Sequence, residues 1–382
     1  MRFQVLDSWR GVCALLVALF HLDVLSHVWG LPLLRNAYLF VDFFFVLSGF
    51  VISHAYGARL NTHQELGTFM IRRLGRVWPL HLAVLAAFVA VELVKWGLSN
   101  GLGLTAGQPA FDAGGRAAIA TLPSQILLTQ ALGLNNGLSW NLPSWSISAE
   151  FWTYLVFGLV CVVLPRTKSV MLAAVAALSA IVVVNFAQHG MDATYDLGFP
   201  RCLIGFVLGH LVYRLHRECR RPPAGFAAAL EWAAVIAIVI YVSAADRGPL
   251  SFAAPLVFAC AVYIFSFEAG PISRLLRLAP FQSLGLWSYS IYMVHDLVAY
   301  SLSLGISVAQ RRVGYDIWRE LTSGGTAGRV IDFHSLAAGD GLALGYLAVV
   351  IGLASLTYRY VEKPGQRLFA RLGDRMVPAP AA

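Results

Sequence analysis

The sequence predicts an all-α polytopic membrane protein, a bundle of about ten transmembrane helices with both termini in the cytoplasm. Of its 382 residues, 58% are hydrophobic and only 13% are charged, whereas soluble domains carry about 25% charged residues. Mean hydropathy is +0.68, and apolar runs recur along nearly the whole chain. We therefore expect one transmembrane domain over residues 1–367 and a short cytoplasmic tail over 368–382, disordered at its end.

The apolar runs are each close to the length of about 20 residues that a helix needs to cross a bilayer. We place the spans at residues 9–28, 37–56, 77–96, 143–164, 169–187, 197–215, 227–244, 250–267, 281–304 and 341–361. The first run has no small-residue cleavage pattern after it, so we expect it to remain as a helix and not to be removed as a signal peptide.

The basic residues lie between the spans. With the N-terminus inside, most of the 28 Lys and Arg residues fall in cytoplasmic segments, as the positive-inside rule requires. Because the net charge of +8 is distributed over these segments and does not form one patch, we expect no nucleic-acid partner. The five cysteines are scattered without metal-ligand spacing, so we expect neither a metal site nor a disulfide.

Two long segments are expected on the outer side. Residues 97–142 contain a short apolar piece, from Ile126 to Leu134, that either lies on the membrane surface or enters it as a re-entrant segment. Residues 305–340 are charged and rich in glycine. They form either a solvated connection or a lid over an outward-facing site.

The first span carries two ionisable residues. Arg10 and His21 are eleven positions apart, about three helical turns, so their side chains share one face about 16 Å apart. Arg10 is placed at the inner surface and His21 in the outer half of the bilayer. Ionisable groups at that depth are costly and indicate function.

The same topology brings ionisable residues from five spans to one outer layer. They are His21, Asp42, Glu150, Arg201 and His295. For His21 and Glu150 a functional role is favoured over a structural one. Asp42 and Arg201 lie near the headgroups, where a structural ion pair or an interfacial anchor is an equal alternative.

A basic cluster precedes the third span at the inner surface. Arg73 and Arg76 lie one turn apart, with Arg72 beside them and Arg10 at the same level. The cluster is either ordinary positive-inside charge or a site for a phosphorylated ligand, because guanidinium groups offer paired donors to phosphate oxygens. Position alone does not choose between these alternatives.

Several stretches resemble, in the same order, the signature motifs of the membrane-bound acyltransferases called the acyltransferase 3 family. LDSWRGVCALLVALFH resembles the opening motif, in which ten residues separate Arg10 from His21. The other stretches are VDFFFVLSGFVIS, RRLGRVWP, WSISAEFWTYL, FPRCLIGFVLGHL, LGLWSYSIYMVH and YRYVEKPGQRL. Trp9, His81 and Phe151 depart from the residues that are common at those positions of the family.

The resemblance implies an enzyme that transfers an acyl group, most often acetyl, from cytoplasmic acyl-CoA to a hydroxyl of a carbohydrate or another small acceptor. It implies His21 as the catalytic residue, Arg10 as its motif partner and Glu150 as a site residue. Arg73 and Arg76 would bind the phosphates of coenzyme A. We therefore expect acetyl-CoA as donor, His21 as a general base oriented by Glu150, and a place in a bacterial inner membrane.

Two other classes of function remain open from the sequence. A transporter or exporter also carries charged residues at mid-depth, although the spans show no evident internal repeat. A non-catalytic accessory subunit would bind acyl-CoA without turnover. The sequence identifies neither the acceptor, nor the acyl group, nor the oligomeric state.

Overall fold

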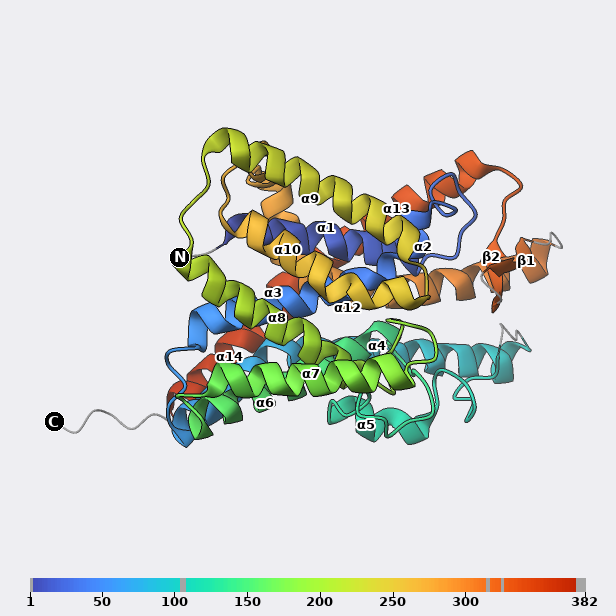
Figure 1. Cartoon of the computed structure of the whole chain (residues 1–382). Helices are drawn as coiled ribbons and strands as arrows, with labels where there is room; N and C mark the ends of the chain where they lie inside the picture. The colour runs from blue at the N-terminus through green and yellow to red at the C-terminus, as the bar shows by residue number, and fades with distance from the viewer. Residues whose placement is uncertain (1–2, 104–107, 314–316, 324–325, 376–382) are drawn as a thin grey trace.

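The computed structural model describes residues 3–103, 108–313, 317–323 and 326–375. Its helices pack side by side along one common direction (Figure 1). The long helices are α1 (Gln4–Phe20), α3 (Phe40–Tyr56), α4 (His63–Leu102), α6 (Trp145–Val163), α7 (Lys168–Phe186), α8 (Gly198–Glu218), α9 (Ala224–Ala245), α10 (Ala254–Ser266), α12 (Ala279–Val313) and α13 (Leu336–Thr357). The shorter ones are α2 (Pro32–Arg35), α5 (Leu122–Ile126), α11 (Pro271–Leu276) and α14 (Lys363–Arg375).

These helices confirm a polytopic membrane protein. Each expected span overlaps one of the long helices. Within the described residues, 8 helical segments are long and apolar enough to cross a membrane. The other two expected spans correspond to α1, which has 17 residues, and to α8, whose last turn is basic.

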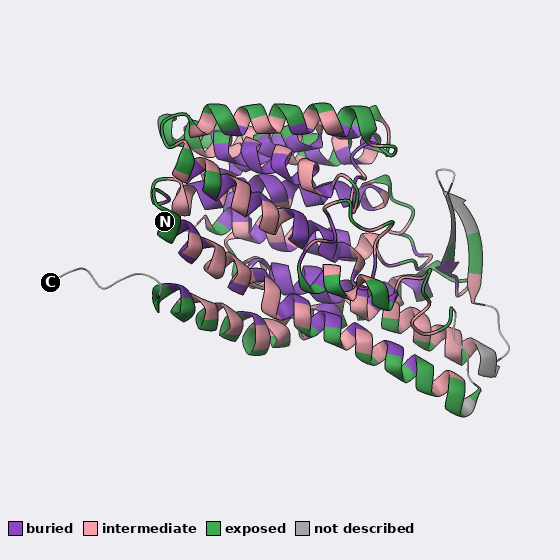
Figure 2. Cartoon of the chain, turned by 90° about the horizontal axis from the view of Figure 1, so that it is seen from below, coloured by how far each residue is buried: buried purple, intermediate pink, exposed green. Residues whose placement is uncertain are grey.

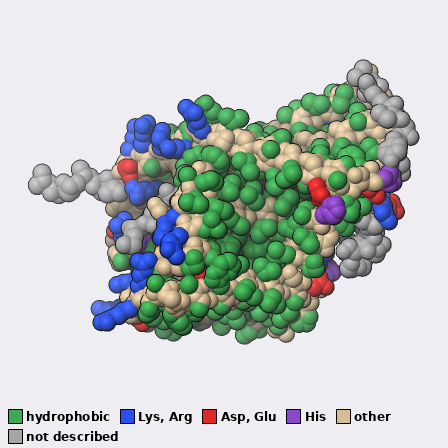
Figure 3. Space-filling view, turned by 90° about the horizontal axis from the view of Figure 1, so that it is seen from above, with side chains coloured by type: hydrophobic (Ala, Val, Ile, Leu, Met, Phe, Trp, Pro, Cys, Tyr) green, Lys and Arg blue, Asp and Glu red, His purple; other side chains and the backbone are tan. Residues whose placement is uncertain are grey.

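The two ends of the bundle differ in charge. Lys and Arg side chains gather at the end where α1 begins and α14 lies, and a broad hydrophobic belt separates them from the other end (Figure 3). The positive-inside rule assigns this basic end to the cytoplasm. The buried residues concentrate on the inward faces of the helices, and the outermost faces are exposed (Figure 2), as expected for helices that meet lipid.

The first helix is shorter than predicted, because the expected span 9–28 ends at Phe20. His21 closes α1 as its C-cap residue. Beyond it the chain turns, and Val24 pairs with Ile331 in a short parallel bridge. The backbone groups after His21 thus find partners in another segment and do not continue the helix.

The fourth helix is the longest in the described chain, with 40 residues, so it extends for about 60 Å. It begins with a capping box between Thr62 and Glu65 and ends at Gly103, whose φ of 64° is in the left-handed region. On its cytoplasmic half it packs against α14, where Gly75 leaves room for the side chain of Phe369.

Two helix pairs approach each other closely at glycines. A Cβ atom at Gly11 of α1 would lie 2.5 Å from the backbone of Leu284 in α12, and one at Gly285 would lie 2.5 Å from the carbonyl oxygen of Asp7. The pair α3 and α8 meets in the same way at Gly49. Small residues permit such contact between membrane helices. The spacing of α1 and α12, which carry His21 and His295, is therefore fixed by backbone contact.

The segment between α4 and α6 enters the bundle. Trp78 Nε1 donates to the carbonyl oxygen of Ile126 at 2.9 Å, and His81 Nε2 donates to that of Gln125 at 2.8 Å. Trp78 lies about 22 Å from the first residue of α4, well inside the helix. Of the two alternatives that the sequence left open, these contacts support a re-entrant segment.

The outer segment 305–340 contains strands that the all-helical prediction did not include. β1 (Trp318–Ser323) and β2 (Thr326–Ile331) form an antiparallel hairpin with Trp318 opposite Ile331. The backbone N–H of Ile331 donates to the carbonyl oxygen of Asp23 at 2.9 Å. The hairpin is therefore attached to the chain just after His21. The predicted disordered end of the tail lies outside the described residues.

Candidate active site

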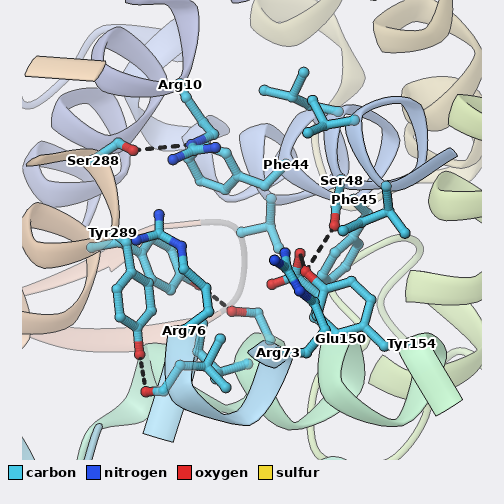
Figure 4. A pocket seen from close by; sticks show the side chains of 18 residues that line it. Arg10, Phe44, Phe45, Ser48, Arg73, Arg76, Glu150, Tyr154, Ser288 and Tyr289 are labelled. Atoms are coloured by element: carbon cyan, nitrogen blue, oxygen red, sulfur yellow. Dashed lines mark hydrogen bonds between the residues drawn. The ribbon is translucent and has the colours of Figure 1, made fainter. Parts of the chain in front are cut away.

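A cavity lies between α1, α3, α4, α6 and α12, toward the basic end of the bundle (Figure 4). It holds about 790 Å³ of space free of protein atoms, including the solvent at its mouth. Its polar lining comes from Arg10, Ser48, Arg73, Arg76, Ser146, Glu150, Tyr154, Ser288, Tyr289 and Tyr292. We call it the arginine cavity. Four of the sequence-predicted site residues thus meet in one place: Arg10, Arg73, Arg76 and Glu150.

The three guanidinium groups of the arginine cavity are held differently. Arg10 Nε donates to Ser288 Oγ at 3.0 Å. Arg76 forms an ion pair with Glu362 and lies 5.3 Å from the centre of the Tyr289 ring. Arg73 lies over aromatic rings, and its Nε is buried without a hydrogen-bond partner. An N–H group in that state is ready to donate to an incoming acceptor.

Glu362 is a site residue that the sequence analysis missed. Its side chain is fully buried, and its second carboxylate oxygen accepts from Ser290 Oγ at 2.7 Å. It ends a π-helical turn, Tyr358–Glu362, at the junction of α13 and α14. Such turns are rare and frequently occur at functional sites. The sequence feature that could have indicated Glu362 is its place as the acidic residue of the YRYVEKPGQRL motif.

Glu150 lines the arginine cavity. Its described hydrogen bond is made there and not with His21 or His295. Its Oε1 accepts from the Tyr154 hydroxyl at 2.5 Å, and that hydroxyl also contacts Ser48 Oγ at 3.0 Å. The ring of His21 has its described contacts elsewhere. The structure therefore does not bring Glu150 and His21 together, and the expectation that Glu150 orients His21 is wrong in its geometry.

His21 is paired with His295 of α12. His21 Nδ1 lies 2.9 Å from the carbonyl oxygen of Val17 and 3.3 Å from His295 Nε2. His295 Nδ1 lies 3.2 Å from the carbonyl oxygen of Ile291. Because carbonyl oxygens only accept hydrogen bonds, Nδ1 is the donor of each ring in its contact with the main chain. With Nδ1 as the donor, the Nε2 of a neutral His21 ring is the acceptor.

Tyr292 contacts both the arginine cavity and the histidine pair. It lines the cavity, and its ring centre lies 5.7 Å from that of His295. Its hydroxyl accepts from Ser146 Oγ at 2.9 Å and donates to the carbonyl oxygen of Pro143 at 3.1 Å. One side chain thus connects the cavity that gathers the arginines with the pair that carries the basic nitrogen.

Asp42 and Arg201 form a buried ion pair between α3 and α8. Arg201 Nε and Nη2 donate to the two oxygens of Asp42 at 3.1 and 2.8 Å. Nη1 donates to the carbonyl oxygen of Ala193 at 3.1 Å. Both side chains are at most 1% exposed. Nearly all polar atoms of the pair have hydrogen-bond partners inside the protein. This agrees with a structural ion pair, one of the alternatives that the sequence left open. Across the described ranges, no three metal-ligating side chains converge.

The fold and the cavity define a class of protein: a polytopic membrane protein with a cavity between its helices that is lined by three arginines. A family model described as an acyltransferase domain matches residues 3–318, most of the chain. The chain therefore belongs to the acyltransferase 3 family, and it is a membrane acyltransferase. This confirms the resemblance drawn from the motifs.

Curated relatives agree with this assignment. The chain is 29% identical over 304 residues to a putative membrane-bound transacylase, BcsY, of Komagataeibacter xylinus, covering 77% of this chain and 72% of that protein. It is 28% identical over 353 residues to the acyltransferase MdmB of Streptomyces mycarofaciens, covering 87% and 81%. No solved structure matches the chain significantly.

Proposed function

We propose that this membrane acyltransferase takes an acetyl group from acetyl-CoA at the cytoplasmic face and transfers it to a hydroxyl of a carbohydrate or another small acceptor, in the inner membrane of a bacterium. The observation that supports the donor assignment is the arginine cavity, whose lining includes Arg10, Arg73 and Arg76. Guanidinium groups bind phosphate oxygens with paired donors, and coenzyme A is rich in phosphate.

The chain's own residues fit such a donor. The buried Nε of Arg73 lacks a partner, so a phosphate oxygen would satisfy it. Arg10 is set by Ser288, and Arg76 by Glu362, which fixes both side chains before a ligand arrives. Glu150, which lies beside Arg73 (Figure 4), offsets part of the positive charge. The thioester would lie past Tyr292, next to the histidine pair.

His21 would act as the general base. Its unprotonated Nε2 takes the proton of the acceptor hydroxyl while the hydroxyl oxygen bonds to the thioester carbonyl carbon. The carbon–sulfur bond breaks, and His21 returns the proton to the leaving sulfur, which yields an O-ester and free coenzyme A thiol. His295 is a positioning residue, because its Nε2 accepts from His21 Nδ1 and stabilises that tautomer.

The test uses the purified protein in nanodiscs with radiolabelled acetyl-CoA and no ion gradient. Release of coenzyme A, with label passing to acceptor or water, supports the proposal. A requirement for a gradient would support the transporter alternative. Donor binding without any turnover would support the accessory-subunit alternative.

A further inference from the structure

A groove opens at the basic end of the bundle, beside the start of α9. It lies between the segment after α8, the first turns of α9 and the end of α10, and it holds about 910 Å³, including the solvent at its mouth. We call it the α9 groove. Among the described residues, none lines both this groove and the arginine cavity, so the two are separate sites.

Most of the wall of the α9 groove is apolar. Phe226 and Leu230 lie one turn apart on α9, and Ile264 and Phe267 line the groove from the end of α10. The Phe226 side chain is 60% exposed. α9 is apolar enough to cross the membrane, lies at the edge of the bundle (Figure 1) and buries only 28% of its most apolar stretch. The apolar wall therefore borders the lipid.

Two arginines form the basic edge of the groove. Arg220 and Arg221 lie in the segment between α8 and α9, and both are exposed. Arg221 Nη2 donates to the carbonyl oxygen of Glu268 at 2.9 Å, which holds its guanidinium beside the groove. Within the described part of the chain, neither arginine has a carboxylate as an ion-pair partner. Their positive charges are free to attract an anion.

The carboxylate of Glu231 also lines the groove, but it is directed into the wall. The residue is 1% exposed, and its oxygens accept from the backbone N–H groups of Gly270 and Ser273 at 2.8 and 2.9 Å and from the Ser273 hydroxyl. These donors belong to the start of α11, where a carboxylate is stabilised by the helix dipole. Glu231 thus holds the wall in place and does not pair with the arginines at the edge.

The segment that closes the groove is fixed to the rest of the bundle. The carbonyl oxygen of Glu268 accepts from Arg277 Nη1 at 3.1 Å as well as from Arg221. Glu268 Oε1 accepts from the N–H of Val5, in the first turn of α1, at 3.0 Å. The groove is therefore formed before any ligand enters, so little ordering is needed on binding.

We propose that the α9 groove binds an anionic phospholipid of the cytoplasmic leaflet. Its phosphate would lie at Arg220 and Arg221, and an acyl chain would follow Phe226 and Leu230 into the bilayer. Leu230 lies about 9 Å beyond the first residue of α9, so charge and apolar surface follow each other in the order in which a lipid presents them. Basic pockets between membrane helices on the cytoplasmic side bind anionic headgroups in this way. The site is independent of the proposed acyl transfer.

The first experiment is native mass spectrometry of the purified protein, titrated in detergent with phosphatidylglycerol or with phosphatidylcholine of the same chains. The wild type should retain phosphatidylglycerol preferentially. The double variant Arg220→Ala, Arg221→Ala should bind it about 30-fold more weakly, because each arginine contributes about fivefold. The matched control is Arg59→Ala, Arg166→Ala, which removes the same charge from exposed positions outside the groove. It should bind like the wild type.

Three results would overturn the lipid site. Equal losses in the two double variants would show that net positive charge alone attracts the lipid. Equal retention of the two phospholipids by the wild type would show that the arginines do not select an anion. Displacement of phosphatidylglycerol by inorganic phosphate or by acetyl-CoA would assign the groove to a soluble anion.

A second experiment uses a native thiol as a probe of the groove. Cys219 lines the groove and is exposed, whereas exposed Cys260 of α10 lies outside its lining. In nanodiscs, phosphatidylglycerol should slow the labelling of Cys219 by a maleimide relative to phosphatidylcholine, and the labelling of Cys260 should not change. The protection should disappear in the Arg220→Ala, Arg221→Ala variant. Equal labelling of Cys219 in both lipids would show that no phospholipid occupies the groove.

Discussion

The arginine cavity and a second cavity at the outer end of the bundle differ in how their guanidinium groups are held. In the arginine cavity, Arg10 and Arg76 each have a carboxylate as ion-pair partner, whereas the buried Nε of Arg73 has no hydrogen-bond partner. The second cavity lies between α4, α12 and the β-hairpin, and we call it the hairpin cavity. There Arg116 is paired with a carboxylate, and Arg329 lies over an aromatic ring. A buried N–H group that lacks a partner gains a hydrogen bond when an anion enters. Among the described residues that line the two cavities, Arg73 alone has such a buried donor.

The largest expected effect is that of His21→Ala. Loss of a general base should lower transfer by about 10²- to 10⁴-fold. Donor affinity should stay unchanged, because His21 does not line the arginine cavity. Transfer of labelled acetyl and titration calorimetry measure the two quantities, with exposed His63→Ala as control. A matching loss of donor affinity would contradict the separation between donor binding and chemistry.

Arg201→Ala tests the buried ion pair between α3 and α8, which lies outside the lining of both cavities. Removing the guanidinium leaves the Asp42 carboxylate buried and unpaired, which costs about 3–5 kcal/mol of unfolding free energy. Thermal unfolding should detect this loss, while the KM for acetyl-CoA of the remaining folded enzyme stays the same. Arg166→Ala, at an exposed position, is the control. A changed KM with normal stability would make Arg201 part of the donor site.

Arg73→Ala should weaken donor binding and leave the histidine pair intact. A charge-assisted hydrogen bond contributes about 1.5–3 kcal/mol, so the Kd for acetyl-CoA should rise about 10- to 100-fold. The matched control is Arg72→Ala, the neighbouring residue. Its Nε also lacks a partner, but its guanidinium pairs with Asp374 and does not line the cavity. Equal effects of the two substitutions would show that the arginine cluster serves only as positive-inside charge and does not bind the donor.

The smallest effect is expected from Glu362→Gln. This change removes the carboxylate charge beside Arg76 and keeps the contact with Ser290. Because a donor phosphate no longer competes with a carboxylate for Arg76, acetyl-CoA should bind about threefold more tightly. Exposed Glu218→Gln should have no effect. Weaker binding would show instead that Glu362 acts mainly by positioning Arg76.

The helical bundle and the arginine cluster could be predicted from the sequence because hydropathy and loop charge act along one dimension. Depth in the membrane follows from counting residues, and it placed Arg10, Arg73 and Arg76 at one level. The partners of each side chain depend on how the helices are rotated, and one residue turns a helix by about 100°. Depth alone therefore predicts Glu150 beside His21, whereas in the structure the carboxylate of Glu150 accepts a hydrogen bond from Tyr154.

Glu362 and the hairpin escaped prediction for other reasons. The π-helical turn at Tyr358–Glu362 changes the helical phase, so regular spacing gives the wrong face for Glu362. The hairpin strands are stabilised by pairing with each other and with residues just after His21, far away in sequence. Long-range pairing of this kind leaves little local pattern in a short, charged segment.

One helix, which continues past an internal proline, Pro79, borders both cavities. Arg73 and Arg76 lie in the first half of α4, and Lys95 lies near its far end. Adding a single residue between these positions would turn one half of α4 against the other by about 100° and shift it by about 1.5 Å. Such an insertion would change no side chain of either cavity, yet it would rotate the residues of one cavity relative to those of the other. The length of α4 thus sets the relative orientation of the two cavities.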